Sequence, residues 1–240
     1  MDLNSVILTT SGSVGFFKLV NCGLNKLPAP ESARRNVWKW KNISTSLAHS
    51  IITGLWAVLC FYLHPRMAED LIATHSVFSH ALVCVSIGYF IYDFLDMVHN
   101  QKLSQSWELL FHHVVVITCF GMSVLTGQYV GFAVVALLVE INSVFLHLRQ
   151  VLRMAGLGKT TPYRINSMVN LGTYVVFRIS TLAWMTRWLV LNREHVPLLS
   201  YTVGSVGLAI VTGMNIVLFY RLLRSDFLQN GREPRKEKEA

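Results

Sequence analysis

Charged side chains are scarce in this 240-residue sequence: Asp, Glu, Lys and Arg together make up 14% of it. A soluble domain carries about 25% of these residues, so the chain lacks the polar side chains that a water-exposed surface requires. Hydrophobic residues make up 52% and occur in blocks close to the roughly 20 residues that cross a bilayer as a helix. The composition therefore predicts an all-α polytopic membrane protein, with no room for a separate soluble core.

Cysteine is also scarce, and its positions favour neither a metal site nor a disulfide. The four cysteines are Cys22, Cys60, Cys84 and Cys119, and they form no C-x-x-C motif. Three of them lie within apolar runs, where we expect them to pack as small apolar side chains. No two histidines have the His-x₃-His spacing of a zinc site on a helix, so we expect no bound metal.

The apolar runs predict about seven transmembrane helices. These cover residues 3–21, 44–63, 76–98, 109–126, 129–148, 168–191 and 198–222. The first run lacks a basic n-region and an A-x-A cleavage site, so we interpret it as an anchor helix rather than a cleaved signal peptide. Only Gly127 and Gln128 separate the fourth run from the fifth, which predicts a tight antiparallel pair.

Lysine and arginine positions predict the orientation of these helices. With the N-terminus outside or in the lumen, 17 of the 21 basic side chains fall on the cytoplasmic side, and the C-terminus is cytosolic. The net charge of +8 then suits anionic lipid headgroups, and we expect no nucleic-acid partner. Residues 1–34 form an anchor helix and a basic linker, residues 35–225 a membrane domain, and residues 226–240 a disordered charged tail.

Polar and titratable side chains interrupt the apolar runs, and their helical spacing places them on shared faces. The set comprises Asp93, Asp96, His112, His113, Glu140, Ser143, His147, Tyr174, Arg178 and Asn215. A charge at bilayer depth costs several kcal/mol unless it faces a partner or a wet cavity. We therefore expect these faces to surround a polar cavity that opens to the cytosol and binds a lipid or an acyl chain.

His112 and His113 are the candidate catalytic residues, because a histidine beside a carboxylate can act as a general base or nucleophile. Neighbours on a helix point about 100° apart, so at most one of them faces the cavity squarely. Other interpretations stay open for the remaining groups. Asp93 and Asp96 could be hydrated, inert interfacial residues, and His147 could lie at headgroup level. Glu140 and Arg178 could form a buried structural pair.

Five segments resemble one known family in their order and spacing. They are "SLAHSIITGLWAVL", "GYFIYDFLDMVHNQ", "WELLFHHVVVIT", "GFAVVALLVEINSVFLHLRQVL" and "FYRLLRSDF". Together they resemble the TLC-domain family, which includes the ceramide synthases, the translocation-associated membrane proteins and small TLC domain-containing proteins. The resemblance covers roughly residues 35–225. It implies a six-helix barrel with an added N-terminal helix and a long central cavity.

The resemblance also implies which residues carry the chemistry of this family. Ceramide synthases use paired histidines on one helix, matched here by His112 and His113. They also use a His-Asp pair and a second Asp on the next helix, where this sequence has Val139-Glu140 and Ser143. Half of the acyl-transfer machinery is therefore missing, and the chain is expected to act without catalysis or with weak catalysis.

The small members of the family imply the leading hypothesis for function. They limit the incorporation of polyunsaturated acyl chains into phospholipids, mainly phosphatidylethanolamine, and so promote membrane rigidity at the plasma membrane. Under this hypothesis Arg178 or the cytoplasmic basic residues contact lipid phosphate, and no cofactor is needed. An acyl-CoA-dependent lipid acyltransferase is the alternative, and a channel or transporter accessory subunit is the third. Lys236 and Lys238 form a K-x-K-x-x pattern similar to a dilysine retrieval signal, so the endoplasmic reticulum membrane is the alternative location.

Overall fold

The computed structural model describes residues 1–26 and 28–228, and every element within them is helical. The α-helices are α1 (Leu3–Gly23), α2 (Val37–Leu63), α3 (Arg66–Glu69), α4 (Val77–Asn100), α5 (Leu103–Thr126), α6 (Val130–Leu137), α7 (Glu140–Met154), α8 (Thr161–Tyr174), α9 (Ser180–Leu191) and α10 (Leu198–Leu223). The 3₁₀ turns are η1 (Leu24–Lys26), η2 (Glu31–Asn36) and η4 (Arg193–His195). Two π turns, η3 (Val175–Ile179) and η5 (Arg224–Leu228), complete the structure.

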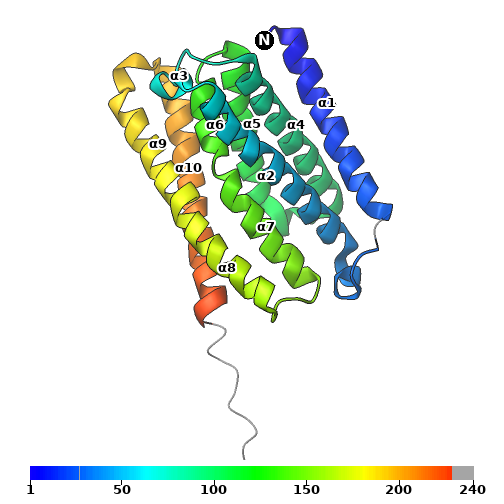
Figure 1. The fold of residues 1–240 in the computed structure, drawn as a ribbon. Helices are drawn as coiled ribbons and strands as arrows, with labels where there is room; N and C mark the ends of the chain where they lie inside the picture. Colours follow the sequence, from blue (N-terminus) through cyan, green and yellow to red (C-terminus); the bar gives the residue numbers. More distant parts are fainter. Residues whose placement is uncertain (27, 229–240) are drawn as a thin grey trace, which may run out of the picture.

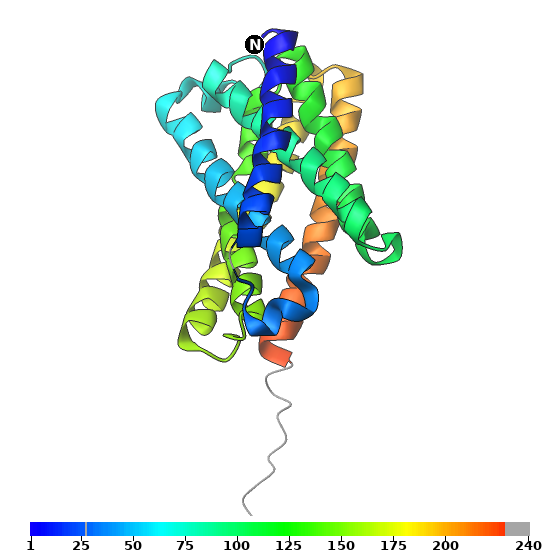
Figure 2. The ribbon, with the colours of Figure 1, turned by 90° about the vertical axis from the view of Figure 1, so that its right-hand side faces the viewer.

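Six long helical segments form a closed ring, and α1 lies outside it (Figure 1). Around the ring α2 packs against α4, α4 against α5, α5 against α10, and α10 against α9. The ring closes through α8 against α7 and α7 against α2. Turned by 90°, the molecule presents α1 in front of the ring (Figure 2). The expected barrel of six segments with an added N-terminal helix is therefore present.

Six helical segments are long and apolar enough to cross a membrane, within the part of the chain that is described. They are Leu3–Lys26, Glu31–Leu63, Val77–Asn100, Leu103–Thr126, Val130–Met154 and Leu198–Asp226. The predicted span at 168–191 is helical through α8, η3 and α9 but is not among the six. Asn170, Arg178 and Arg187 lower the mean hydropathy of this predicted span, which accounts for its absence from the six. The predicted all-α polytopic membrane fold is confirmed.

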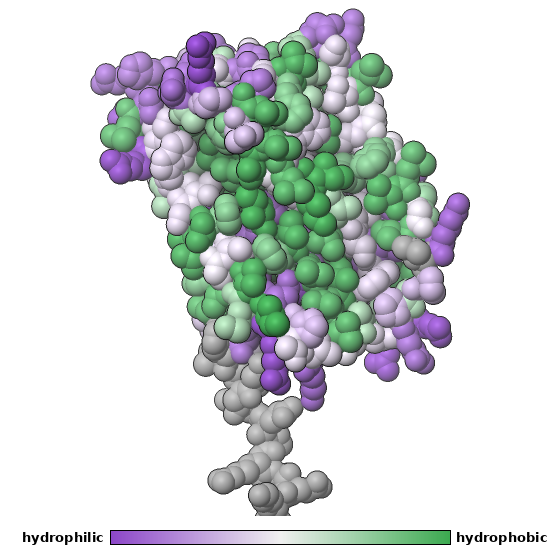
Figure 3. All heavy atoms as spheres, viewed as in Figure 1, coloured by the Kyte–Doolittle hydropathy of each residue, from purple (hydrophilic) through white to green (hydrophobic). Residues whose placement is uncertain are grey.

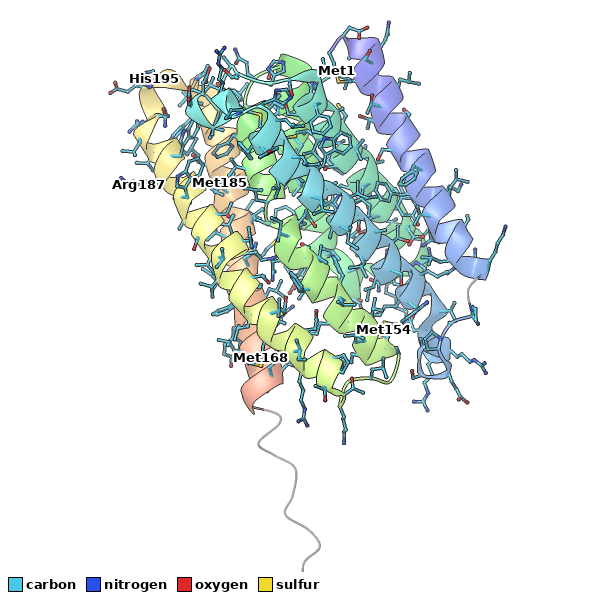
Figure 4. All side chains as sticks on the ribbon, in the orientation of Figure 1. Met1, Met154, Met168, Met185, Arg187 and His195 are labelled. Atoms are coloured by element: carbon cyan, nitrogen blue, oxygen red, sulfur yellow. The ribbon has the colours of Figure 1, made fainter. Side chains whose placement is uncertain are left out.

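The two ends of the bundle differ from its middle in polarity. Figure 4 labels Met1 and His195 near one end, called here the Met1 end, and Met154 near the other, the Met154 end. Hydrophobic side chains cover the middle of the face drawn in Figure 3, and hydrophilic ones gather toward both ends. At the Met154 end, buried Arg149 donates hydrogen bonds to Ser225 and Asp226, which fastens η5 to α7. The predicted tail begins within η5, and its residues 229–240 lie outside the described part.

Helix α1 is attached to the ring by a close contact at Gly88 and by buried side chains, among them Ser13 and Phe17. A Cβ atom added to Gly88 of α4 would lie 2.5 Å from the Thr10 carbonyl oxygen and from Ser13 Cβ. Ser13 Oγ donates to the Val85 carbonyl oxygen at 2.6 Å. Phe17 is fully buried, and its ring meets the edge of the Tyr89 ring with centroids 5.0 Å apart. The anchor helix is thus fixed against α4 by glycine and aromatic packing.

Two helical segments are irregular at the middle of the bundle. Between α6 and α7 the amides of Leu138 and Val139 bond three residues back, to Val135 and Ala136, so the helix tightens just before Glu140. Between α8 and α9 the π turn η3 contains Arg178. π turns are rare and often occur at functional sites. Both irregularities therefore lie beside residues that the sequence singled out.

Candidate functional site

A largely apolar cavity of about 140 Å³ lies within the ring between α5, α6, α9 and α10. Aliphatic and aromatic side chains such as Phe120, Leu182 and Trp188 line most of it. His112 and Glu140 lie on its wall near the middle of the bundle. Its lining reaches Tyr129 and Val196, which belong to the connections at the Met1 end. An elongated apolar space with a few polar groups is typical of sites for apolar ligands.

The sequence predicted a cavity of a different kind: a polar one, in the half of the bundle on the same side as the C-terminus. Of the predicted site residues, His112 and Glu140 line the cavity described above. The others lie toward the Met154 end and mostly bond to one another. Hydrogen bonds between helices satisfy most of these polar groups, because the alternative in lipid is an unpaired charge.

His113 and Asp93 form the first of these networks, between α5 and α4. His113 Nε2 lies 2.9 Å from Asp93 Oδ2, and both side chains are almost completely buried. Asn42 of α2 donates to Asp93 Oδ1 at 2.5 Å and to Asp96 Oδ2 at 3.3 Å. Trp38 Nε1 donates to the same Asp96 oxygen at 2.8 Å. The two aspartates therefore join three helices of the ring.

This network occupies both ring nitrogens of His113. Nδ1 lies 2.6 Å from the Leu109 carbonyl oxygen, which can only accept, so Nδ1 carries a proton. Nε2 then either donates a hydrogen bond to the Asp93 carboxylate or accepts one from the Asp93 carboxylic acid. In both states the Nε2 lone pair is not available to a substrate. Of the two candidate histidines, His112 is therefore the one that can act on a cavity ligand.

Glu140 and His112 form the polar floor of the cavity, and Glu140 is bonded from behind by α2. Ser50 Oγ donates to Glu140 Oε2 at 2.7 Å, and His49 Nδ1 lies 4.0 Å from the same oxygen. The His49 ring stacks on Tyr89 with centroids 3.7 Å apart, and the edge of Phe17 contacts both rings. An aromatic cluster that extends to α1 therefore packs behind the Glu140 side chain.

Arg178 forms the second network, with α7 and α10. Its Nε donates to Asn142 Oδ1, its Nη1 to Asn215 Oδ1 and its Nη2 to Ser143 Oγ, each at 2.7 Å. Tyr174 donates to the Asn215 carbonyl oxygen at 2.7 Å and lies beneath the guanidinium. Within the described residues no ion pair joins Arg178 to Glu140, so the suggested structural pair is not formed.

The remaining predicted residue, His147, is partly buried on α7 and makes no hydrogen bond in the described part of the chain. Metal binding finds no support in the side chains, since no three His, Cys, Asp or Glu residues gather as ligands within residues 1–26 and 28–228.

Sequence reasoning missed the contribution of α2 and of Asn142. Four polar residues of α2 follow the spacing i, i+4, i+7, i+11: Asn42, Ser46, His49 and Thr53. Tyr89, Asp93, Asp96 and Asn100 have the same spacing on α4. All four residues of α2 are buried. Asn142 is completely buried and bonds to Asn170 and Thr173 as well as to Arg178. The helical spacing on α2 was a usable signal, whereas uncharged Asn142 gave none.

Known proteins resemble this chain along nearly all of its length. A family profile described as the TLC domain matches residues 39–224. TLC domain-containing protein 2 of Danio rerio is 80% identical over 100% of this chain and 98% of its own length. The human protein of that name is 42% identical over 95% of this chain and 86% of its own length. Human TLC domain-containing protein 1 is 35% identical, covering 90% and 88%. The profile covers most of the ring, and the relatives align over most of this chain and of their own length. These matches establish that the chain belongs to the TLC domain family.

Proposed function

We propose that this protein regulates the acyl composition of membrane phospholipids by binding acyl chains in the cavity. It limits the incorporation of polyunsaturated chains into phospholipids, chiefly phosphatidylethanolamine, and so promotes membrane rigidity. The observation that carries the proposal is the long apolar space that ends on His112 and Glu140. Its partners are membrane phospholipids or their acyl chains, and binding of this kind requires no cofactor.

Acyl-CoA-dependent acyl transfer is the second candidate, and one observation favours it. His112 lies on the cavity wall beside Glu140 and makes no hydrogen bond within residues 1–26 and 28–228, so its ring is available as a base. Against transfer, both nitrogens of His113 are occupied, and Ser143 accepts a bond from Arg178 rather than facing a substrate. A channel or transporter accessory role ranks last, since the cavity lining toward the Met1 end is mostly apolar.

Filling the cavity tests the proposal directly. Gly204 of α10 lines the cavity, and a Cβ atom there meets only Leu189 at 3.8 Å, so Gly204→Phe is expected to fold and to occupy the space. Gly213 of the same helix is exposed with nothing within 4 Å of an added Cβ, so Gly213→Phe is the matched control. Cells lacking the protein, fed a polyunsaturated fatty acid, are rescued with each variant, and phospholipid acyl chains are measured by mass spectrometry.

We expect wild type and Gly213→Phe to lower the polyunsaturated fraction of phosphatidylethanolamine, and Gly204→Phe to fail at equal expression. Full rescue by Gly204→Phe, or no effect of wild type, contradicts the proposal. His112→Ala separates the two candidates. Rescue by His112→Ala supports binding alone, whereas its failure, together with turnover of acyl-CoA by purified wild type, favours transfer.

The proposed orientation places the Met1 end outside, with the plasma membrane as the location and the endoplasmic reticulum as the alternative. Ala68 in α3 and Leu157 between α7 and α8 are exposed near opposite ends of the bundle. In intact cells an impermeant maleimide is expected to label Ala68→Cys, and to label Leu157→Cys only after permeabilisation. Cys22 is exposed as well, so both variants are made in Cys22→Ser. The reverse labelling pattern contradicts this orientation.

A further inference from the structure

The polar floor of the cavity carries hydrogen-bond acceptors and the Glu140 carboxylate, and no Lys or Arg of the described residues lines it. Glu140 retains 12% accessibility of its side chain and lines the cavity. Its Oε2 accepts from Ser50, and no described residue donates to Oε1. His112 also lies at this floor, and its ring has no hydrogen-bond partner among the described residues.

The nearest cationic group is turned toward other acceptors. Arg178 directs three of its N–H groups at the oxygens of Asn142, Ser143 and Asn215. His49 is 4.0 Å from Glu140, but its side chain is only 2% accessible and lies on the side away from the cavity. Among the Asp, Glu, Lys and Arg side chains of the described residues, Glu140 is the one that lines the cavity, so a ligand that reaches the floor meets its carboxylate.

We infer that the cavity takes an acyl lipid whose inserted polar end donates hydrogen bonds, a hydroxyl or an amine, and that Glu140 excludes an anionic end. A hydroxyl or ammonium group satisfies the free carboxylate oxygen, while its hydrocarbon chain lies along the apolar lining. A carboxylate end places a second negative charge beside Glu140 in a medium of low dielectric constant, where like charges repel strongly. This inference rests on the proposed lipid cavity and adds the sign and chemistry of what enters it.

Three probes with the same 18-carbon chain test the inference: oleyl alcohol, oleylamine and oleate. Binding to the purified full-length protein in maltoside micelles is measured from the rise in thermal unfolding midpoint with probe concentration, since a ligand of the folded state stabilises it. We expect the alcohol and the amine to bind about tenfold or more tightly than oleate. Glu140→Gln keeps the shape and removes the charge, so oleate is expected to gain and the amine to lose affinity.

Two variants serve as controls. Glu108→Gln removes a carboxylate that is 47% exposed on the outside of the bundle, and it is expected to leave the ranking unchanged. Gly204→Phe is expected to weaken all three probes, which separates cavity binding from effects on the micelle.

Each outcome decides the question. Oleate binding as tightly as oleyl alcohol to wild type, or no binding of any probe, overturns the inference even if Glu140→Gln does not fold. An unchanged ranking in folded Glu140→Gln overturns the role of Glu140. These results are independent of the cellular acyl profile, so a failure here is distinguishable from a failure of the proposed function.

Discussion

Replacing Asn142 by leucine is expected to destabilise the ring because this side chain joins α7 to Arg178 and to α8. Asn142 is completely buried, and its Oδ1 accepts from Arg178 Nε at 2.7 Å. A hydrogen bond to a charged group contributes about 1.5–3 kcal/mol. Its amide also donates to Asn170 and Thr173, and interhelical bonds of this kind in membranes average about 0.6 kcal/mol each. The substitution is therefore expected to cost about 3–4 kcal/mol.

Thermal unfolding in detergent micelles measures this cost. For a chain of this size each kcal/mol lowers the midpoint by about 2–4 °C, so Asn142→Leu is expected to lower it by about 6–16 °C. Gln150→Leu makes the same kind of exchange on α7 at a side chain without a hydrogen bond in the described residues, and serves as the control. A shift of Asn142→Leu no larger than that of Gln150→Leu would refute the reasoning. It would mean that water or a rearranged Arg178 replaces the lost bond.

Three further predictions follow from other contacts. His113→Ala leaves the buried Asp93 side chain without its ring partner and is expected to cost about 3–5 kcal/mol, with part regained in Asp93→Asn/His113→Ala. Wild-type stability of the single variant in micelles contradicts this. Gly88→Val is expected to push α1 from α4 at a cost of about 1–3 kcal/mol and to speed proteolysis of the 24–36 connection, whereas Gly121→Val, with no atom within 4 Å of an added Cβ, should not. The Ala73 and Ile72 amides donate to the Asp70 carboxylate and hold the pKa of Asp70 below its usual range. The ionised carboxylate therefore stabilises the fold above the unfolded-state pKa of about 3.9, and this stabilisation is lost as the pH falls below that value. Asp70→Asn is therefore expected to lower the unfolding midpoint at pH 7 and to match wild type near pH 2, and equal differences at both pH values contradict the assignment.

Apolar length located the helices well, but it did not locate their ends. The predicted spans began at residues 44 and 109, whereas α2 begins at Val37 and α5 at Leu103. Each missing turn carries polar side chains, such as Lys39 and Glu108, which extend a helix beyond the lipid without adding hydropathy. Asn36 caps α2 by accepting from the Lys39 amide, a local signal that hydropathy does not weigh. Predicting the ends of a membrane helix therefore requires two criteria: the apolar length that crosses the lipid and the capping residues that lie in water.

Helical spacing predicted which faces of α4, α7 and α8 carry the polar groups, but it could not predict how those groups divide between networks. His112 and His113 are neighbours, yet one lines the cavity and the other is bound to Asp93 and Leu109. That division depends on the rotation of α5 against α4, which packing across the ring sets. The prediction that Arg178 contacts lipid phosphate rested on its charge alone, and its acceptors from α7 and α10 are visible only in three dimensions.

The two irregular turns explain how one ring keeps an acidic and a basic group at the same level without pairing them. Tightening at Leu138 and Val139 precedes Glu140, which meets Ser50 on α2. The wider π turn η3 contains Arg178, whose guanidinium donates to Asn142 and Ser143 on α7 and to Asn215 on α10. Asn142 and Glu140 lie two residues apart and so point to different sides of α7. Because the two charges have separate polar partners, the carboxylate remains open to the cavity while the guanidinium is satisfied within the wall. A direct ion pair would have closed the floor of the cavity, whereas this arrangement leaves it able to receive a ligand.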